Sequence, residues 1–179
     1  MLVKTGREGL AARAGHDLTL EITQWSARVT VPADGDTSES VTLTAELDLG
    51  SLTVREGTGG AKPLTDRDRR DIQNQASKIL GSTAHARFQS TRVFRAASSS
   101  GSGAIEGTLS LNGVSRSTRL EVTNPGPGRY RGGTTIKQTE FGITPYSGFF
   151  GALKLRDAVT VEFEVTIEVK SQESPNGSA

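Results

Sequence analysis

The sequence contains no cysteine, and this excludes disulfide bonds, thiolate metal ligands and thiol nucleophiles. It has only two histidines, His16 and His85, which leaves little for a transition-metal site or a Ser-His pair. The formal net charge is +1, so there is no electrostatic reason to expect a nucleic-acid partner. From the residues alone we expect no metal and no cofactor.

Long apolar runs are also missing from the sequence. No segment approaches about 18 uninterrupted apolar residues, so we expect no stable membrane span. The N-terminal residues lack the basic region and the apolar run of a secretory signal. We therefore expect a cytoplasmic protein, or a periplasmic or secreted one only if a leader has been removed.

Alternation of apolar and polar residues is the main pattern that the sequence does contain. Between residues 159 and 169, valine, phenylalanine and isoleucine occupy the odd positions, whereas threonine and glutamate occupy the even ones. The same alternation runs through residues 41–49 and 105–111. A period of two residues predicts strands with one dry face and one solvated face. Further strands are predicted for residues 84–96 and 130–139.

Two local signals predict how the strands are joined and bent. The pair Asn112-Gly113 predicts a tight hairpin between two alternating runs, because both turn positions need positive φ. Residues 124–128 predict a loop. The apolar positions of residues 18–22 are even, whereas those of residues 25–31 are odd. Such a slip of one residue predicts a β-bulge, which helps a long strand to bend around a barrel.

One segment breaks the alternation and predicts a helix. Residues 65–80 are charged, free of glycine and proline, and place Ile72 and Ile79 on one helical stripe. Thr65 is the expected N-cap, and Gly81 is the expected stop. In total, the pattern predicts an all-β protein of about eight antiparallel strands with one helix. Such strands can form a sandwich or close into a barrel.

Five segments occur in an order that is typical of one family. They are residues 15–29, which begin Gly-His-Asp-Leu, and residues 41–52, 86–91, 107–116 and 141–143. In this order they are similar to the elements of the YceI-like family, and the resemblance runs from residue 1 to about residue 169. It implies an eight-stranded antiparallel lipocalin-like barrel with one helix packed over or near one end. It also implies a single domain over residues 1–170. From the residues themselves, we expect a disordered tail over residues 171–179.

The resemblance further implies a protein without catalytic activity that holds a long apolar ligand in its barrel: a polyisoprenoid, an isoprenoid quinone or a fatty-acyl lipid. Together with the strand parities, it predicts which residues line the ligand site. The inward set is Leu20, Ile22, Leu43, Leu47, Phe88, Leu109, Leu111, Ile136, Val161 and Phe163. The further expected contacts are aromatic: Trp25, Phe141, Tyr146, Phe149 and Phe150, of which all but Phe141 are candidates for the mouth of the barrel.

Two features each admit two interpretations. His16 is either a hydrogen-bond donor to a ligand headgroup at the mouth or a polar side chain satisfied at the start of a strand. Residues 141–151 hold four aromatic side chains and are interrupted by glycine and proline, which predicts a loop. That loop is either a lid that grips the ligand or a plug that closes a filled barrel.

Three functions compete at this point. The leading hypothesis is a binding or carrier protein with an apolar lipid as its partner. The alternative is a structural or interaction module with a filled barrel and no ligand. An enzyme acting on an apolar substrate would need convergent polar residues inside the barrel, and the inward positions are almost wholly aliphatic or aromatic. The sequence also allows sheet edges to pair into a homodimer.

Overall fold

The computed structural model describes residues 1–31, 41–81, 84–95 and 101–168. The predicted tail over residues 171–179 lies outside the described residues. Eleven strands and one α-helix occur within this part of the chain. They are β1 (Leu2–Glu8), β2 (Asp17–Ile22), β3 (Trp25–Thr30), β4 (Thr42–Asp48), β5 (Leu52–Thr58), α1 (Asp66–Leu80), β6 (His85–Arg95), β7 (Ser102–Leu111), β8 (Val114–Gly126), β9 (Arg129–Lys137), β10 (Ser147–Gly148) and β11 (Leu153–Thr166).

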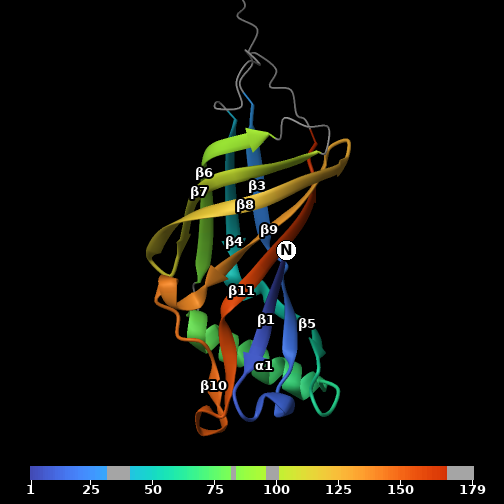
Figure 1. Cartoon of the computed structure of the whole chain (residues 1–179), viewed down its shortest axis with the longest axis vertical. Helices are drawn as coiled ribbons and strands as arrows, with labels where there is room; N and C mark the ends of the chain where they lie inside the picture. The colour runs from blue at the N-terminus through green and yellow to red at the C-terminus, as the bar shows by residue number, and fades with distance from the viewer. Residues whose placement is uncertain (32–40, 82–83, 96–100, 169–179) are drawn as a thin grey trace, which may run out of the picture.

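The strands form one antiparallel sheet in the order β3-β4-β6-β7-β8-β9-β11-β1-β2-β5, with β10 paired to β11. β3 and β5 stand at opposite ends of this order. However, β2 leads directly into β3, and β4 leads directly into β5. The sheet therefore curls until its two ends meet in one ribbon (Figure 1). The predicted all-β, lipocalin-like barrel with one helix is confirmed.

The predicted count of eight strands is lower than the eleven described, mainly because two long segments are each broken. β2 gives way to β3 at Thr23 and Gln24, and the opposite segment breaks at the 3₁₀ turn Leu49–Ser51. The hydroxyl of Thr23 donates to the carbonyl oxygen of Ser51 at 3.0 Å, and the Gln24 N–H donates to Ser51 Oγ at 2.9 Å. The structure thus has a break where a bulge was predicted. Before the break β2 pairs with β5, and after it β3 pairs with β4.

The predicted hairpin is confirmed. β7 and β8 are joined at Asn112 (φ 51°) and Gly113 (φ 73°). Both residues adopt the left-handed conformation that asparagine and glycine accept most easily in a two-residue turn. The loop predicted over residues 124–128 is shorter than expected, because β8 continues to Gly126 and pairs there with Arg129.

The predicted helix is also confirmed, with both of its ends. The Thr65 hydroxyl accepts a hydrogen bond from the Asp68 N–H at 3.2 Å, and an Asp68 carboxylate oxygen accepts one from the Thr65 N–H at 2.8 Å. This reciprocal capping box satisfies two N–H groups at the start of the helix. Gly81 follows the last turn with a φ of 89°, a conformation for which glycine pays no steric penalty.

The core lies at the end of the barrel where α1 crosses it (Figure 1). Ile79 and Leu80 of α1 pack against a cluster of buried residues there. The cluster is Ile22, Leu47, Ala86, Leu111, Phe141 and Ile143. We call this end the closed end and the opposite end the open end. Among the described residues, no helix is both long enough and apolar enough to cross a bilayer.

Candidate functional site: the inner face of the barrel

Strand register determines which side chains share the inner face. Residues directly opposite each other in antiparallel strands lie on the same face of a sheet. One row crosses five neighbouring strands through the pairs Trp25–Leu47, Leu47–Ala86, Ala86–Leu111 and Leu111–Val114. On the other wall, a second row joins Leu20, Val3, Val161 and Thr134. Both walls therefore present a mainly apolar surface to the interior.

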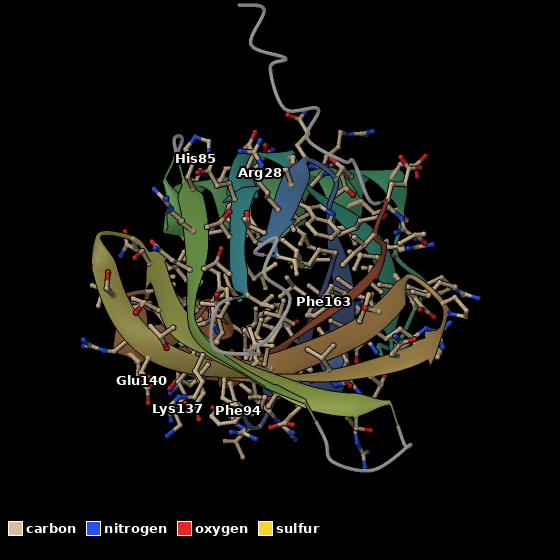
Figure 2. All side chains as sticks on the ribbon, turned by 90° about the horizontal axis from the view of Figure 1, so that it is seen from above. Arg28, His85, Phe94, Lys137, Glu140 and Phe163 are labelled. Carbon is tan, nitrogen blue, oxygen red and sulfur yellow. The ribbon has the colours of Figure 1, made fainter. Side chains whose placement is uncertain are left out.

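Burial of the inner face decreases from the closed end towards the open end. Ile22 and Leu111, in the closed-end cluster, are 2% and 7% exposed. Farther along, Leu109 and Val161 are only partly buried, and so is Phe163. Figure 2 looks into the barrel from the open end, with Phe163 pointing inward. Part of the apolar surface inside the barrel is therefore not covered by the described residues.

Several inner positions carry small residues. They are Ala27, Ala45, Gly103, Gly107, Gly132 and Thr134, which register places on the inner face. At two of them a phenyl ring occupies the space a side chain would need: Phe88 lies over Gly107, and Phe163 lies over Gly132. A ring that lies on the sheet reaches less far across the barrel, so the interior contains less side-chain volume.

The structure brings together the ten residues of the predicted inward set. Leu20, Ile22, Leu47, Phe88 and Leu111 are buried, whereas Leu43, Leu109, Ile136, Val161 and Phe163 are partly exposed. Trp25 joins them, because it packs against the closed-end cluster, and Phe141 is a member of that cluster at 1% exposed. The orientation predicted from alternation thus agrees with the structure, whereas a role in binding stays a prediction.

The remaining predicted residues lie elsewhere. His16, Tyr146, Phe149 and Phe150 belong to the loops beyond the closed end, not to the open end (Figure 1). A ring nitrogen of His16, Nε2, lies 2.7 Å from the carbonyl oxygen of Lys62. Phe149 and Phe150 are 65% and 112% exposed. None of the four therefore joins the inward set.

β1 contributes residues that the sequence patterns did not single out. Val3 and Thr5 of β1 point inward beside Leu18, Leu20 and Val159. Thr5 is 8% exposed, and its hydroxyl oxygen has no hydrogen-bond partner in the described part of the chain. Alternation of Val3 and Thr5 with Lys4 was the available signal, but it spans too few residues to identify a strand.

Several ion pairs lie on the outer face. Lys4 pairs with Glu162 at 2.8 Å, and Glu164 pairs with Arg129 and Arg131 at 2.9 and 3.1 Å. Hydrogen bonds from Arg129 and then from Arg131 hold the pKa of the Glu164 carboxyl below its usual range. Within residues 1–31, 41–81, 84–95 and 101–168, no three His, Asp or Glu side chains gather closely enough to hold a metal ion.

A curled antiparallel sheet with an apolar inner face and one end closed by a helix defines the lipocalin-like class of barrels. The chain belongs to the YceI-like family, because the model of the YceI-like domain matches residues 7–167. A search of the curated proteins finds no match to the chain.

Solved structures with the same fold come from several bacteria. BcnA from Burkholderia cenocepacia is 15% identical with a TM-score of 0.61, covering 91% of this chain and 93% of that one. The YceI protein from Campylobacter jejuni is 15% identical with a TM-score of 0.56 and 85% coverage of each chain. A polyisoprenoid-binding domain from Saccharophagus degradans is 14% identical with a TM-score of 0.52, covering 91% and 90%. At these identities the likeness concerns the fold alone.

Proposed function

We propose that the protein is a non-catalytic binding protein that holds one long apolar chain along the inner face of the barrel. The ligand class is a polyisoprenoid, an isoprenoid quinone or a fatty-acyl lipid. The observation that carries this proposal is the partial exposure of three apolar side chains on the inner face, those of Leu109, Val161 and Phe163. Covering this apolar surface with an apolar ligand lowers the free energy, because the surface is then removed from water.

The size of that gain supports a chain-like ligand. Each methylene moved from water into an apolar environment contributes about 0.8 kcal/mol. Part of this is offset by the cost of ordering a flexible chain. A ligand of some tens of carbons can therefore bind tightly without a strong polar contact. The fold is shared with a structure described as a polyisoprenoid-binding domain, which supports the choice of ligand class.

The composition of the inner face also supports binding rather than catalysis. The inward positions of the described strands are mainly aliphatic, aromatic or small, whereas general acid–base chemistry needs a positioned titratable group within reach of the substrate. His16, the histidine singled out from the sequence, is engaged with Lys62 in the loops beyond the closed end.

The test is native mass spectrometry of the freshly purified protein, together with lipid analysis of an organic extract of the same sample. We expect a bound species with a long isoprenoid or acyl chain. The variant Leu109→Glu should lose this species. Its control is Thr108→Glu, which places the same charge on the same strand but on the outer face. Circular dichroism checks that both variants fold.

A second variant covers the case in which an inward charge prevents folding. Thr134→Phe adds a ring to a partly buried inner position opposite Val161 and should reduce uptake of long chains while remaining apolar. If the unaltered protein carries no lipid and also refuses added polyisoprenoids, quinones and fatty acids, the proposal is wrong and the barrel is a structural module.

A further inference from the structure

Three large apolar side chains project into solvent beyond the closed end. Leu10, Phe149 and Phe150 are 101%, 65% and 112% exposed. They come from two loops, one after β1 and one between β10 and β11, and a hydrogen bond of 2.9 Å from the Ala11 N–H to the carbonyl oxygen of Ala152 joins these loops. We call Leu10, Phe149 and Phe150 the apolar tip. Both loops lie at the lower end of the molecule in Figure 1.

The backbone holds the two rings in this exposed position. Phe149 and Phe150 have φ values of 49° and 54°, and Gly151 follows at 87°. The left-handed conformation costs a bulky residue of order 1–3 kcal/mol, and such strain is concentrated at functional sites. The loop is fixed on both sides, because Ser147 and Gly148 pair with Lys154 and Leu153. Strand pairing on both sides of the loop therefore holds Phe149 and Phe150 in a strained conformation that leaves both rings exposed.

The two segments that carry the apolar tip, residues 8–16 and 147–156, hold more cations than carboxylates, and Asp17 and Asp157 follow them directly. Residues 8–16 and 147–156 together carry Arg13, Lys154 and Arg156, against one carboxylate, that of Glu8. Arg13, Lys154 and Arg156 are exposed, and none of them takes part in an ion pair between described residues. A small apolar projection with a basic rim matches the chemistry of an anionic lipid surface.

We propose that the apolar tip docks the protein onto an anionic lipid bilayer. The side chains of Leu10, Phe149 and Phe150 enter the boundary between headgroups and acyl chains, and the rim cations lie among the anionic headgroups. A stable protein interface buries about 800 Å² on each side, which is more than three side chains on two narrow loops can offer. The apolar tip therefore fits a bilayer better than a protein partner. The docking does not depend on a ligand in the barrel, so it stands apart from the proposed function.

The test is co-sedimentation of the full chain with vesicles of phosphatidylglycerol and phosphatidylcholine in equal parts, compared with phosphatidylcholine alone. The main variant is Phe149→Asn with Phe150→Asn, because asparagine tolerates the left-handed conformation and should preserve the loop. The matched control is Val31→Asn, which removes an apolar side chain that is 60% exposed away from the tip. Thermal unfolding checks that both proteins fold.

We expect binding to the anionic vesicles that weakens as salt is added, because salt screens exposed charges. Loss of two inserted rings should weaken this binding by about tenfold or more, and Lys154→Glu should weaken it as well. Val31→Asn should bind like the unaltered protein. Leu109→Glu should also keep vesicle binding, which separates this proposal from the one about the barrel.

Three results would overturn the proposal. The first is failure of the unaltered protein to bind anionic vesicles, and the second is equal binding by the double asparagine variant. The third is a dimer in sedimentation velocity that the double variant abolishes, since the apolar tip would then be an interface between two copies of the chain.

Discussion

Phe163 and Gly132 are direct partners across β11 and β9, and the phenyl ring lies over the glycine. A β-carbon at Gly132 would stand 2.7 Å from Cζ of the ring, and it would also collide with the carbonyl oxygen of Glu121 on β8. Contacts this short do not occur in folded proteins, so neither the ring nor the backbone could stay in place. The glycine therefore determines how far the ring reaches into the barrel.

The first prediction is that Gly132→Ala lowers the free energy of unfolding by about 1–3 kcal/mol, the usual cost of overpacking. Urea denaturation measures this change. Gly126→Ala is the control, because a β-carbon at Gly126 meets nothing within 4 Å. Part of the loss should be recovered when Phe163→Leu is added to Gly132→Ala. An unchanged midpoint for Gly132→Ala would show that β8 and β9 can separate without cost.

The second prediction concerns pH. Asp157 accepts hydrogen bonds from the Thr139 N–H at 2.8 Å and from the Thr139 hydroxyl at 2.7 Å. These bonds, that from the hydroxyl first, hold the pKa of the Asp157 carboxyl below its usual range. A lowered pKa in the folded state stabilises the fold above the unfolded pKa of about 4, and this stability is lost as the pH falls through the folded pKa.

Thermal unfolding between neutral pH and pH values below about 4 measures this effect. The unaltered protein should lose melting temperature as the pH falls. The loss should be smaller in Asp157→Asn and also in Thr139→Val, which removes the donating hydroxyl from the other side of the bond. The lowered pKa of Asp68, caused by the Thr65 hydroxyl, and that of Glu164 act in the same direction and remain in both variants. Equal pH dependence in all three proteins would contradict the prediction.

The third prediction is that Thr5→Val raises the free energy of unfolding by about 1 kcal/mol. Thr5 is buried between Leu18 and Val159, and its hydroxyl has no partner among the described residues. A buried hydroxyl without a hydrogen bond is destabilising relative to a methyl group of the same shape. Urea denaturation gives the value. Thr5→Ser, which keeps the hydroxyl and removes the methyl group, should be less stable than the unaltered protein.

The fourth prediction concerns the contact between α1 and β5, the last strand in the sheet order. A guanidinium nitrogen of Arg69 on α1, Nη1, donates to the carbonyl oxygens of Val54 and Arg55, each at 3.1 Å. Arg69→Met should lower the free energy of unfolding by about 1–2 kcal/mol, because these carbonyls lose a charged donor. Amide exchange in α1 should become faster. Arg70→Met, which changes a neighbouring exposed arginine, should leave both measurements unchanged.

The features predicted correctly from the sequence are those that local chemistry decides. Thr65 caps α1 whatever lies around the helix, and Asn112-Gly113 makes a tight turn with only its two flanking strands. Alternation likewise assigned Leu109 and Phe163 to the inner face, because a strand has only two faces.

The features that the sequence did not predict depend on distant segments. The chain breaks at Thr23 because β2 and β3 pair with different strands, which only the closed sheet determines. The aromatic loop was correctly identified as dense in apolar side chains, but its place beyond the closed end follows from the topology. Phe149 and Phe150 were therefore assigned to the mouth of the barrel, whereas the structure has them outside the closed end.

The apolar tip and the open end lie at opposite poles of the barrel (Figure 1). If the apolar tip docks on a bilayer as proposed, the open end faces away from that bilayer and towards water. A ligand held on the inner face would then leave into the surrounding solution, where another protein could bind it. It would not pass directly into the bilayer to which the protein is docked. The two proposed sites, the apolar tip for docking and the inner face for a ligand, thus lie apart, so each can be altered without changing the other.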